Sequence, residues 1–388
     1  MMHYDFDEII QRSDTDCVKY DLRKIVFNDG DVLPMWVADM DFRTPDFIIS
    51  ALRKRLEHEI LGYSFRSKGF SSAIVNWMKS RHQWEIQPDW ISFSPGVVPA
   101  INMIVLAFSQ PGDKIIVQPP VYFPFFSAIE NNGRTRVDNP LKMINGRLCM
   151  DFEDLRSKSA EAKMIIISHP HNPGGSVWTV DELQQLAAIC LENNILMISD
   201  EIHSDLVYAP HKHIPLASLS DEIACQTITC NAPSKTFNIA GLSTSYLIIP
   251  EKALLDRYNH LLNDELHLSG GNLPGNVALE AAYNKGSDWL SQLLGYLQGN
   301  IRLVEEFCKN YLPAIIPIIP ESTYMVWLDC RNLGFTDEEL NEFFIRKARL
   351  GLNEGRQFGP GGEGFMRMNI ACPRSVVLEA LQRLKLAI

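Results

Sequence analysis

The chain has 388 residues, of which 46% are hydrophobic and 21% charged, and a net charge of −11 at pH 7. This length is enough for two domains with substantial cores, and the composition is typical of a globular protein. The negative charge disfavours general binding to nucleic acid or to an anionic membrane, so a phosphate group would have to be bound by a locally built site.

The sequence also disfavours export and membrane insertion. Its first residues, Met1 to Glu8, are acidic and lack the cationic start and apolar core of a signal peptide. No apolar stretch reaches the length of a membrane span. The eight cysteines are scattered and form no Cys-x-x-Cys pair, which is typical of reduced thiols. We therefore expect a cytoplasmic protein.

The first informative segment is Ser94-Pro95-Gly96-Val97-Val98-Pro99. It follows a short apolar run at 90–93 and opens a helix that ends at Gln110-Pro111-Gly112. Free N–H groups and the positive end of this helix, at Gly96, Val97 and Val98, can hold a phosphate dianion. A plain turn between a strand and a helix is the alternative.

The middle of the chain alternates short apolar runs with amphipathic stretches. Strands are expected at 115–118, 164–168, 196–199 and 227–230, and a crossover helix at 180–193. This alternation predicts an α/β fold with a mainly parallel sheet. In such sheets, ligands bind beyond the carboxyl ends of the strands.

Three polar residues follow these apolar runs by a few positions: Asn172, Asp200 and Lys235. They should therefore face one crevice. A lone Lys in a turn is usually a solvated cation, but an amine for a Schiff base, a carboxylate for a pyridinium nitrogen and an amide for a phenolic oxygen together indicate a pyridoxal phosphate site. Tyr122 follows the 115–118 run and could stack on the pyridine ring, although a core position is the alternative.

With these residues in place, the chain resembles aspartate-aminotransferase-type (fold type I) pyridoxal phosphate enzymes, and within them the cystathionine β-lyase/cystalysin group. The resemblance covers nearly the whole chain and is carried by segments 34–42, 171–175, 199–203, 234–238 and 366–374. Segment 34–42 (Pro-Met-Trp-Val-Ala-Asp-Met-Asp-Phe) and the Asp-Glu-Ile-His tetrad that begins at 200 are specific to that group.

The resemblance implies an α/β fold of the pyridoxal-phosphate-dependent transferase type. A large cofactor-binding domain, residues 49–284, would contain a mainly parallel seven-stranded sheet. A smaller α/β domain would combine residues 1–48 with 285–388.

The resemblance also implies a role for each matched residue. Lys235, Asp200 and Tyr122 would be catalytic, and the cofactor would be bound by Gly96, Val97, Val98, Tyr122, Asn172, Asp200, His203, Ser234 and Lys235. The substrate would contact Arg367, Asn172 and Ala38, with Arg367 clamping the α-carboxylate. Tyr63 matches a tyrosine that reaches the phosphate of the neighbouring subunit, which implies a homodimer.

Two departures from the aminotransferase pattern favour a carbon–sulfur lyase. His203 stands where many relatives have a tyrosine, and Ser243 stands where aminotransferases usually have a phosphate-binding arginine. The expected reaction is α,β-elimination from cystathionine-type or cysteine-type amino acids, which gives a thiol, pyruvate and ammonia. A class I/II aminotransferase is the alternative, because both reactions use the same residues up to proton removal.

Two further classes are less well supported. A metal-dependent hydrolase could use His169-x-His171 or His211-x-His213, but neither pair shows a helical ligand face or a placed carboxylate. A non-catalytic regulator could retain the cofactor fold, but there is no basic tail or added recognition segment. We therefore expect no metal.

Overall fold

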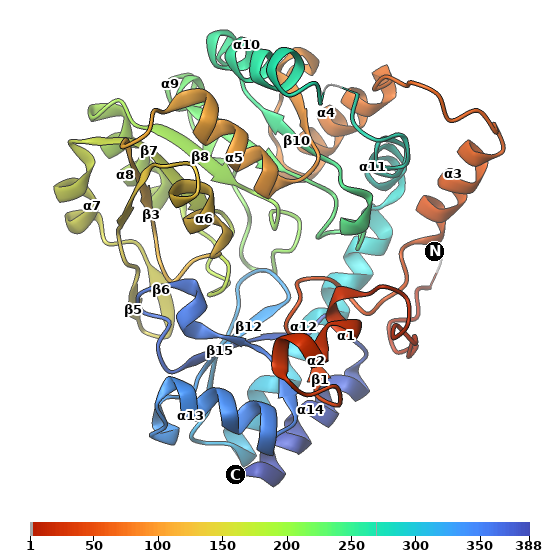
Figure 1. Cartoon of the computed structure of the whole chain (residues 1–388), viewed down its shortest axis with the longest axis vertical. Helices are drawn as coiled ribbons and strands as arrows, with labels where there is room; N and C mark the ends of the chain where they lie inside the picture. Colours follow the sequence, from red (N-terminus) through yellow and green to blue (C-terminus); the bar gives the residue numbers. More distant parts are fainter. Residues whose placement is uncertain (1–2, 269) are drawn as a thin grey trace.

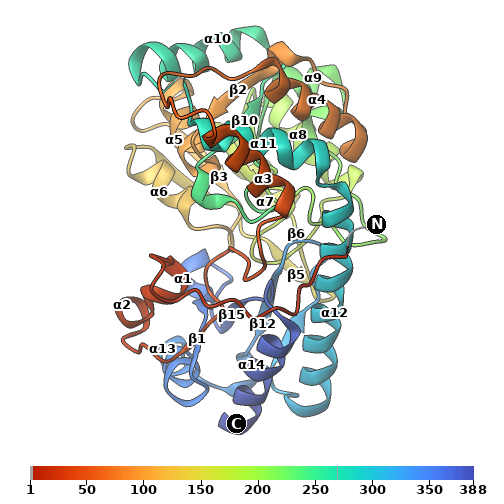
Figure 2. The same ribbon diagram turned by 90° about the vertical axis from the view of Figure 1, so that its right-hand side faces the viewer.

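The computed structural model describes residues 3–268 and 270–388. It contains a large sheet in the upper half and a smaller sheet in the lower half, each with its own helices (Figure 1). The long helix α12 (Ser287–Tyr311) runs along one side of the molecule from the upper half to the lower half, as Figure 2 shows. The N-terminal helices α1 (Val18–Asp21) and α2 (Arg23–Phe27) lie beside the smaller sheet.

The large sheet has seven strands in the order β2-β10-β9-β8-β7-β3-β4. Of its seven strands, only β10 runs in the opposite direction to the others. The prediction of a mainly parallel seven-stranded sheet is therefore confirmed. The strands are β2 (Ile91–Ser94), β3 (Lys114–Val117), β4 (Thr135–Asp138), β7 (Ala162–Ser168), β8 (Leu196–Asp200), β9 (Thr227–Asn231) and β10 (Ser245–Ile248).

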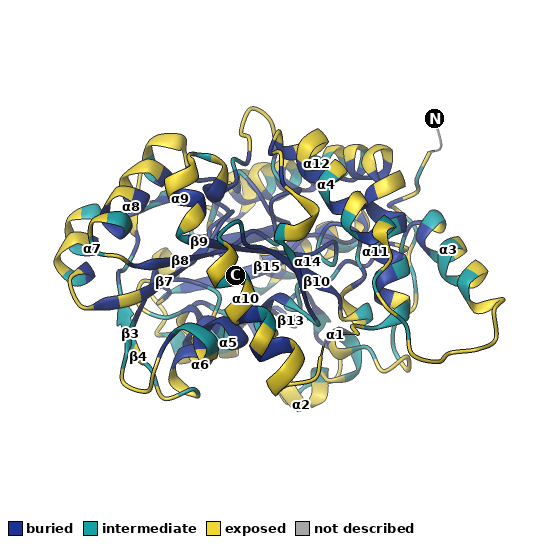
Figure 3. Ribbon diagram, turned by 90° about the horizontal axis from the view of Figure 1, so that it is seen from above, coloured by how far each residue is buried: buried dark blue, intermediate teal, exposed yellow. Residues whose placement is uncertain are grey.

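Helices cover both faces of this sheet (Figure 3). Along β7, Met164 and Ile166 pack on one face and Ile165 and Ile167 on the other, which explains the continuous apolar run. One face carries α5 (Val97–Phe108), α6 (Pro124–Glu130) and α10 (Lys252–His260). The other carries α7 (Phe152–Ser159), α8 (Val180–Glu192) and α9 (Asp221–Cys225).

The expected crossover helix is α8. It begins where Thr179 and Glu182 form a capping box, in which each side chain accepts a hydrogen bond from the other residue's backbone N–H. A third helical group lies beside β2 and β10 and consists of α3 (Asp46–Leu56), α4 (Lys68–His82) and α11 (Leu273–Lys285).

The smaller sheet is antiparallel and has the order β11-β12-β15-β14. Its strands are β11 (Ile316–Ile318), β12 (Met325–Asp329), β14 (Asn353–Glu354) and β15 (Phe365–Asn369), and its helices are α13 (Asp337–Glu342) and α14 (Arg374–Ala387). Two short pairs complete the structure: β1 (Leu33–Pro34) with β13 (Leu350–Gly351), and the hairpin of β5 (Lys142–Ile144) and β6 (Arg147–Cys149). The large and small sheets lie on opposite sides of the expected domain boundaries, which themselves stay a prediction.

Two general properties complete the description. Within residues 3–268 and 270–388, no helix is both long and apolar enough to cross a membrane. All eight cysteines are free thiols, and most of them are buried.

Candidate functional site

The site is a cavity of about 210 Å³ beyond the carboxyl ends of β7, β8 and β9. This is the edge of the sheet where the sequence predicts a ligand. The cavity brings together ten of the predicted residues: Ala38, Gly96, Val97, Val98, Tyr122, Asn172, Asp200, His203, Ser234 and Lys235. Arg367 joins them through a contact with Asn172, whereas Tyr63 lies elsewhere.

Lys235 projects its amine into this cavity from the loop after β9. Its Nζ donates a hydrogen bond to the backbone oxygen of Ala38, at 2.6 Å. Burial lowers the pKa of Lys235 to about 8, and the nearby charge of Arg367 acts in the same direction. A larger fraction of this amine is therefore neutral and nucleophilic than for a solvent-exposed lysine.

Asp200 is the last residue of β8 and is buried. Burial raises the pKa of its carboxyl group to about 7, although the backbone N–H of Ile202 and the charge of Lys235 favour the ionised form. A buried carboxylate of this kind is stabilised by a cationic or proton-donating partner, so the geometry suits a ligand that presents a protonated nitrogen to Asp200.

Arg367 comes from the smaller sheet, on β15, and points toward the large one. Its two terminal nitrogens donate to Asn172 Oδ1 at 3.1 Å, the Trp36 backbone oxygen at 2.8 Å and Asn353 Oδ1 at 2.7 Å. Burial lowers its pKa to about 10, a value at which the guanidinium is still charged at neutral pH. Among the described residues, its hydrogen-bond partners are all neutral, so its charge remains available to an anionic ligand.

His203 and Tyr122 complete the polar and aromatic walls. Burial lowers the pKa of His203 to about 3, helped by the charges of Lys235 and Arg367, so its imidazole is neutral. Its Nδ1 is buried without a hydrogen-bond partner among the described residues, which suggests that a ligand supplies one. Burial also raises the pKa of Tyr122 and keeps its phenol protonated.

The N-terminus of α5 forms the end of the cavity. Gly96 is the N-cap residue and Val97 is the first helical residue, and no acidic side chain occupies the first turn. The first N–H groups of a helix have no partner within the helix and carry its positive dipole end. This end of the cavity is therefore suited to an anion, as the sequence predicts.

Several contacts within the site were not predicted from the sequence. Segment 36–42 accepts hydrogen bonds at four backbone oxygens: at Trp36 from Arg367, at Ala38 from Lys235 and from the Tyr324 hydroxyl, and at Met40 and Phe42 from Asn238 Nδ2. Asn369 on β15 donates to two more oxygens of the segment, those of Val37 and Asp39. No local motif marks Tyr324. Asn369 stands in segment 366–374, but its contacts could not be predicted because its partners lie more than 300 residues away in the chain.

Tyr63 does not contribute to the site of its own chain. It is fully exposed, in the stretch between α3 and α4, and neighbouring Ile60, Leu61 and Phe65 are also exposed. Beside it is a hollow of about 710 Å³ with mainly apolar walls that include Leu52 and Leu273. The role of Tyr63 in a neighbouring subunit therefore stays a prediction.

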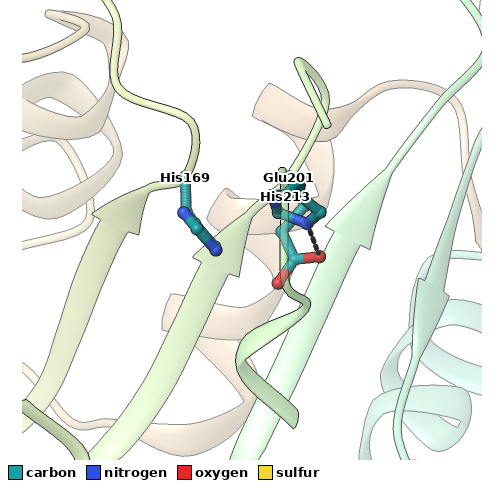
Figure 4. A group of neighbouring side chains, drawn as sticks. All are labelled: His169, Glu201 and His213. Carbon is teal, nitrogen blue, oxygen red and sulfur yellow. Dashed lines mark hydrogen bonds and ion pairs between the residues drawn. The ribbon is translucent and has the colours of Figure 1, made fainter. Parts of the chain in front are cut away.

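A second polar group contains one histidine from each of the two His-x-His pairs. His169, Glu201 and His213 are buried, with possible ligand atoms within 4.8 Å of one another (Figure 4). His213 Nε2 lies 2.9 Å from Glu201 Oε2, Ser199 donates to Glu201 Oε1, and His169 Nε2 lies 2.8 Å from the Ile214 backbone oxygen. The expectation that no carboxylate accompanies these histidines is wrong. Their existing hydrogen bonds join residues 213–214 to the residues that directly follow β7 and β8.

Comparison with known proteins places this arrangement in a family. The chain is 44% identical to cystathionine beta-lyase PatB of Bacillus subtilis over 99% of both chains. A PLP-bound putative aminotransferase from Clostridium difficile has a TM-score of 0.98 and 44% identity, over 99% of this chain and 100% of that one. Cystalysin from Treponema denticola, which contains a pyridoxal 5′-phosphate cofactor, has a TM-score of 0.96 and 38% identity, over 100% and 99%. The family model for aminotransferase class I and II matches residues 31–384, and the chain therefore belongs to that family.

Proposed function

We propose that this protein is a pyridoxal-phosphate-dependent carbon–sulfur β-lyase that acts on cystathionine-type or cysteine-type amino acids. The observation that carries the proposal is the meeting of Lys235, Asp200 and Arg367 around one small cavity. The amine can form a Schiff base with the cofactor and the buried carboxylate can bind its ring nitrogen. The guanidinium, which has no anionic partner in the described part of the chain, can bind the carboxylate of an amino acid. The names of PatB and cystalysin support a lyase reaction.

The residues of the cavity fit pyridoxal phosphate. The N-terminus of α5, together with Ser234, would hold the phosphate, and Asp200 would hold the ring nitrogen. Asn172 and the unpartnered Nδ1 of His203 are suited to the ring oxygen, and Tyr122 is suited to stacking on the ring. Each polar feature of the cavity thus has a counterpart on the cofactor.

The roles of the chain's own residues follow from this arrangement. Bound pyridoxal phosphate supplies an aldehyde for Schiff-base chemistry and a ring that accepts electrons from the broken Cα–H bond. Arg367 binds the substrate carboxylate and fixes the orientation of the α-carbon. Lys235, with its lowered pKa, takes the α-proton as a general base. Asp200 would keep the ring nitrogen protonated. The thiolate leaves Cβ with the electrons of the Cβ–S bond, and one water molecule then hydrolyses the remaining three-carbon enamine to pyruvate and ammonia.

Two cavity residues favour elimination over transamination. Neutral His203 stands where a tyrosine is usual in aminotransferases, and Ser243 stands in the cavity wall where an arginine is usual. One hydrogen bond to a charged group is worth about 1.5–3 kcal/mol, so the phosphate needs compensating contacts. We expect these from α5, from Ser234 and from Tyr63 of a second subunit.

The reaction itself is tested by product analysis. Purified protein given L-cystathionine and no keto acid is expected to release homocysteine, pyruvate and ammonia in equal amounts, because elimination needs no amino acceptor. Pyruvate is measured with a coupled dehydrogenase and thiol with a colorimetric reagent. If turnover requires an added keto acid and leaves the Cβ–S bond intact, the protein is an aminotransferase instead.

We further propose a homodimer in which Tyr63 reaches the phosphate site of the other subunit. The support is the full exposure of Tyr63 in an apolar stretch, away from the cavity of its own chain.

The eight free thiols support a reducing, cytoplasmic location. We also propose that residues 49–284 form the cofactor-binding domain, supported by the position of the large sheet.

Tyr63→Phe is expected to weaken cofactor retention by about tenfold, because one hydrogen bond to a charged phosphate is lost. Dialysis against a cofactor-free buffer, followed by the visible absorbance, measures this retention, and light scattering shows that the dimer persists. Tyr311→Phe, at another exposed tyrosine, is the matched control and should retain cofactor normally. Equal retention by both variants would contradict the role of Tyr63.

A further inference from the structure

A buried carboxylate that touches neither the cavity nor its proposed ligand lies directly behind the Lys235 loop. Asp205 is on the loop after β8, five residues beyond Asp200, and is almost fully buried. It accepts hydrogen bonds from Trp77 Nε1 at 3.0 and 3.2 Å and from the Thr236 hydroxyl at 2.9 Å, and lies 2.9 Å from His82 Nε2. Asp205 therefore has three polar partners, from α4 and from the residue next to Lys235.

This carboxylate is held in its ionised form. Burial by itself would raise the pKa of Asp205, but the hydrogen bonds from His82 and Thr236 and the charges of His82 and Arg81 together hold this pKa below its ordinary value. His82 is the last residue of α4, and its imidazole is buried beside Asp205. Trp77 and His82 thus fix a negative charge at one point beneath the site.

Thr236 connects that fixed point to the catalytic amine. It is buried and follows Lys235 directly in the chain, and its hydroxyl donates to Asp205 Oδ2. The next residue, Phe237, packs against Trp77, with ring centres 5.9 Å apart. The loop that carries Lys235 is therefore attached to α4 and to the loop after β8 that carries Asp205.

We propose that Asp205, acting through Thr236, is a positioning residue that sets where the amine of Lys235 lies relative to Asp200. This proposal rests on the proposed function, because it requires Lys235 to be the residue that binds the cofactor. When the amine condenses with the aldehyde, a C=N bond forms and one water molecule leaves. Both this condensation and the later transfer of the α-proton require the nitrogen to be aligned, and a misplacement of about 1 Å costs on the order of 100-fold in rate.

The test replaces the Thr236 hydroxyl with a methyl group of the same shape. Thr236→Val and Thr236→Ser are purified and stripped of cofactor, and the rate at which the visible absorbance returns on adding pyridoxal phosphate is measured. Steady-state kcat and KM with cystathionine are measured separately. Thr227→Val is the matched control, because the buried Thr227 hydroxyl donates only to the Ile223 backbone oxygen, at the far end of β9.

Thr236→Val is expected to regain absorbance and to turn over about 10- to 100-fold more slowly than wild type, with KM changed by less than about twofold. Thr236→Ser, which keeps the hydroxyl, should behave like wild type. Thr227→Val should lose thermal stability but keep both rates. If Thr236→Val shows only the lower melting temperature of Thr227→Val, Thr236 is merely structural and the proposal is wrong.

A second variant, Asp205→Asn, tests the same proposal if Thr236→Val does not fold. Asp205→Asn keeps an acceptor for Thr236 but removes the charge opposite His82, and it should also slow the return of absorbance. Wild-type rates in Asp205→Asn would overturn the role of Asp205. The absorbance measurement does not depend on the reaction catalysed, so a wild-type protein that forms no pyruvate refutes the lyase proposal and leaves this inference to be decided independently.

Discussion

Lys235→Ala is expected to reduce elimination by about 10⁴-fold or more, because the nucleophile that attaches the cofactor and the base that removes the α-proton are lost together. The cofactor should still bind to the cavity, but reversibly. After borohydride reduction, mass spectrometry should find the added cofactor mass on wild-type protein and none on the variant. Pyruvate release is measured in parallel.

The matched control is Lys252→Ala, on the surface of α10, where the side chain only pairs with Asp256. It should keep full activity and retain the added mass. A Lys235→Ala protein that still carries covalent cofactor would show that another amine forms the linkage, and the assignment of the site would then be wrong.

Asp200→Asn should lower the elimination rate by about 10- to 100-fold while leaving Lys235 able to attach the cofactor. The lost contact is a charge-assisted hydrogen bond of about 1.5–3 kcal/mol to the ring nitrogen, and each 1.36 kcal/mol corresponds to a factor of ten. The effect should fall on kcat, since the ring accepts electrons only as the α-proton leaves. Steady-state kinetics with cystathionine measure it.

Asp264→Asn is the control for this variant, because Asp264 is exposed and pairs only with the neighbouring His260. It should not change kcat. If Asp200→Asn retains the wild-type kcat, the ring nitrogen is not held by Asp200, and this part of the site assignment is wrong.

Much of the fold could be predicted from local patterns. The β7 and β8 runs are buried on both faces and therefore read as continuous apolar segments, and the Thr179–Glu182 capping box marks the start of α8. Asn172, Asp200 and Lys235 could be placed in one crevice because parallel strands end at a common edge. These inferences need only the sequence near each residue.

The remaining features depend on long-range contacts that no local pattern records. The antiparallel direction of β10, the bond from Tyr324 to Ala38 and the pairing of Thr236 with Asp205 each join segments that meet only in the folded chain. The same holds for Glu201 beside His213, whose carboxylate was not expected there. Partner residues of this kind follow from topology rather than from propensity or periodicity.

Segment 36–42 has a mechanical consequence. Arg367 donates a hydrogen bond to its backbone at Trp36, and Lys235 donates one at Ala38. A stretch of only three residues therefore connects the guanidinium proposed to bind the substrate with the amine proposed to bind the cofactor. Asn369 on β15 bonds the backbone oxygens of Val37 and Asp39, and Asn238 on the Lys235 loop bonds those of Met40 and Phe42. The segment therefore acts as a fixed spacer: the main chain between Trp36 and Ala38 sets the separation of the guanidinium of Arg367 and the amine of Lys235 across the cavity.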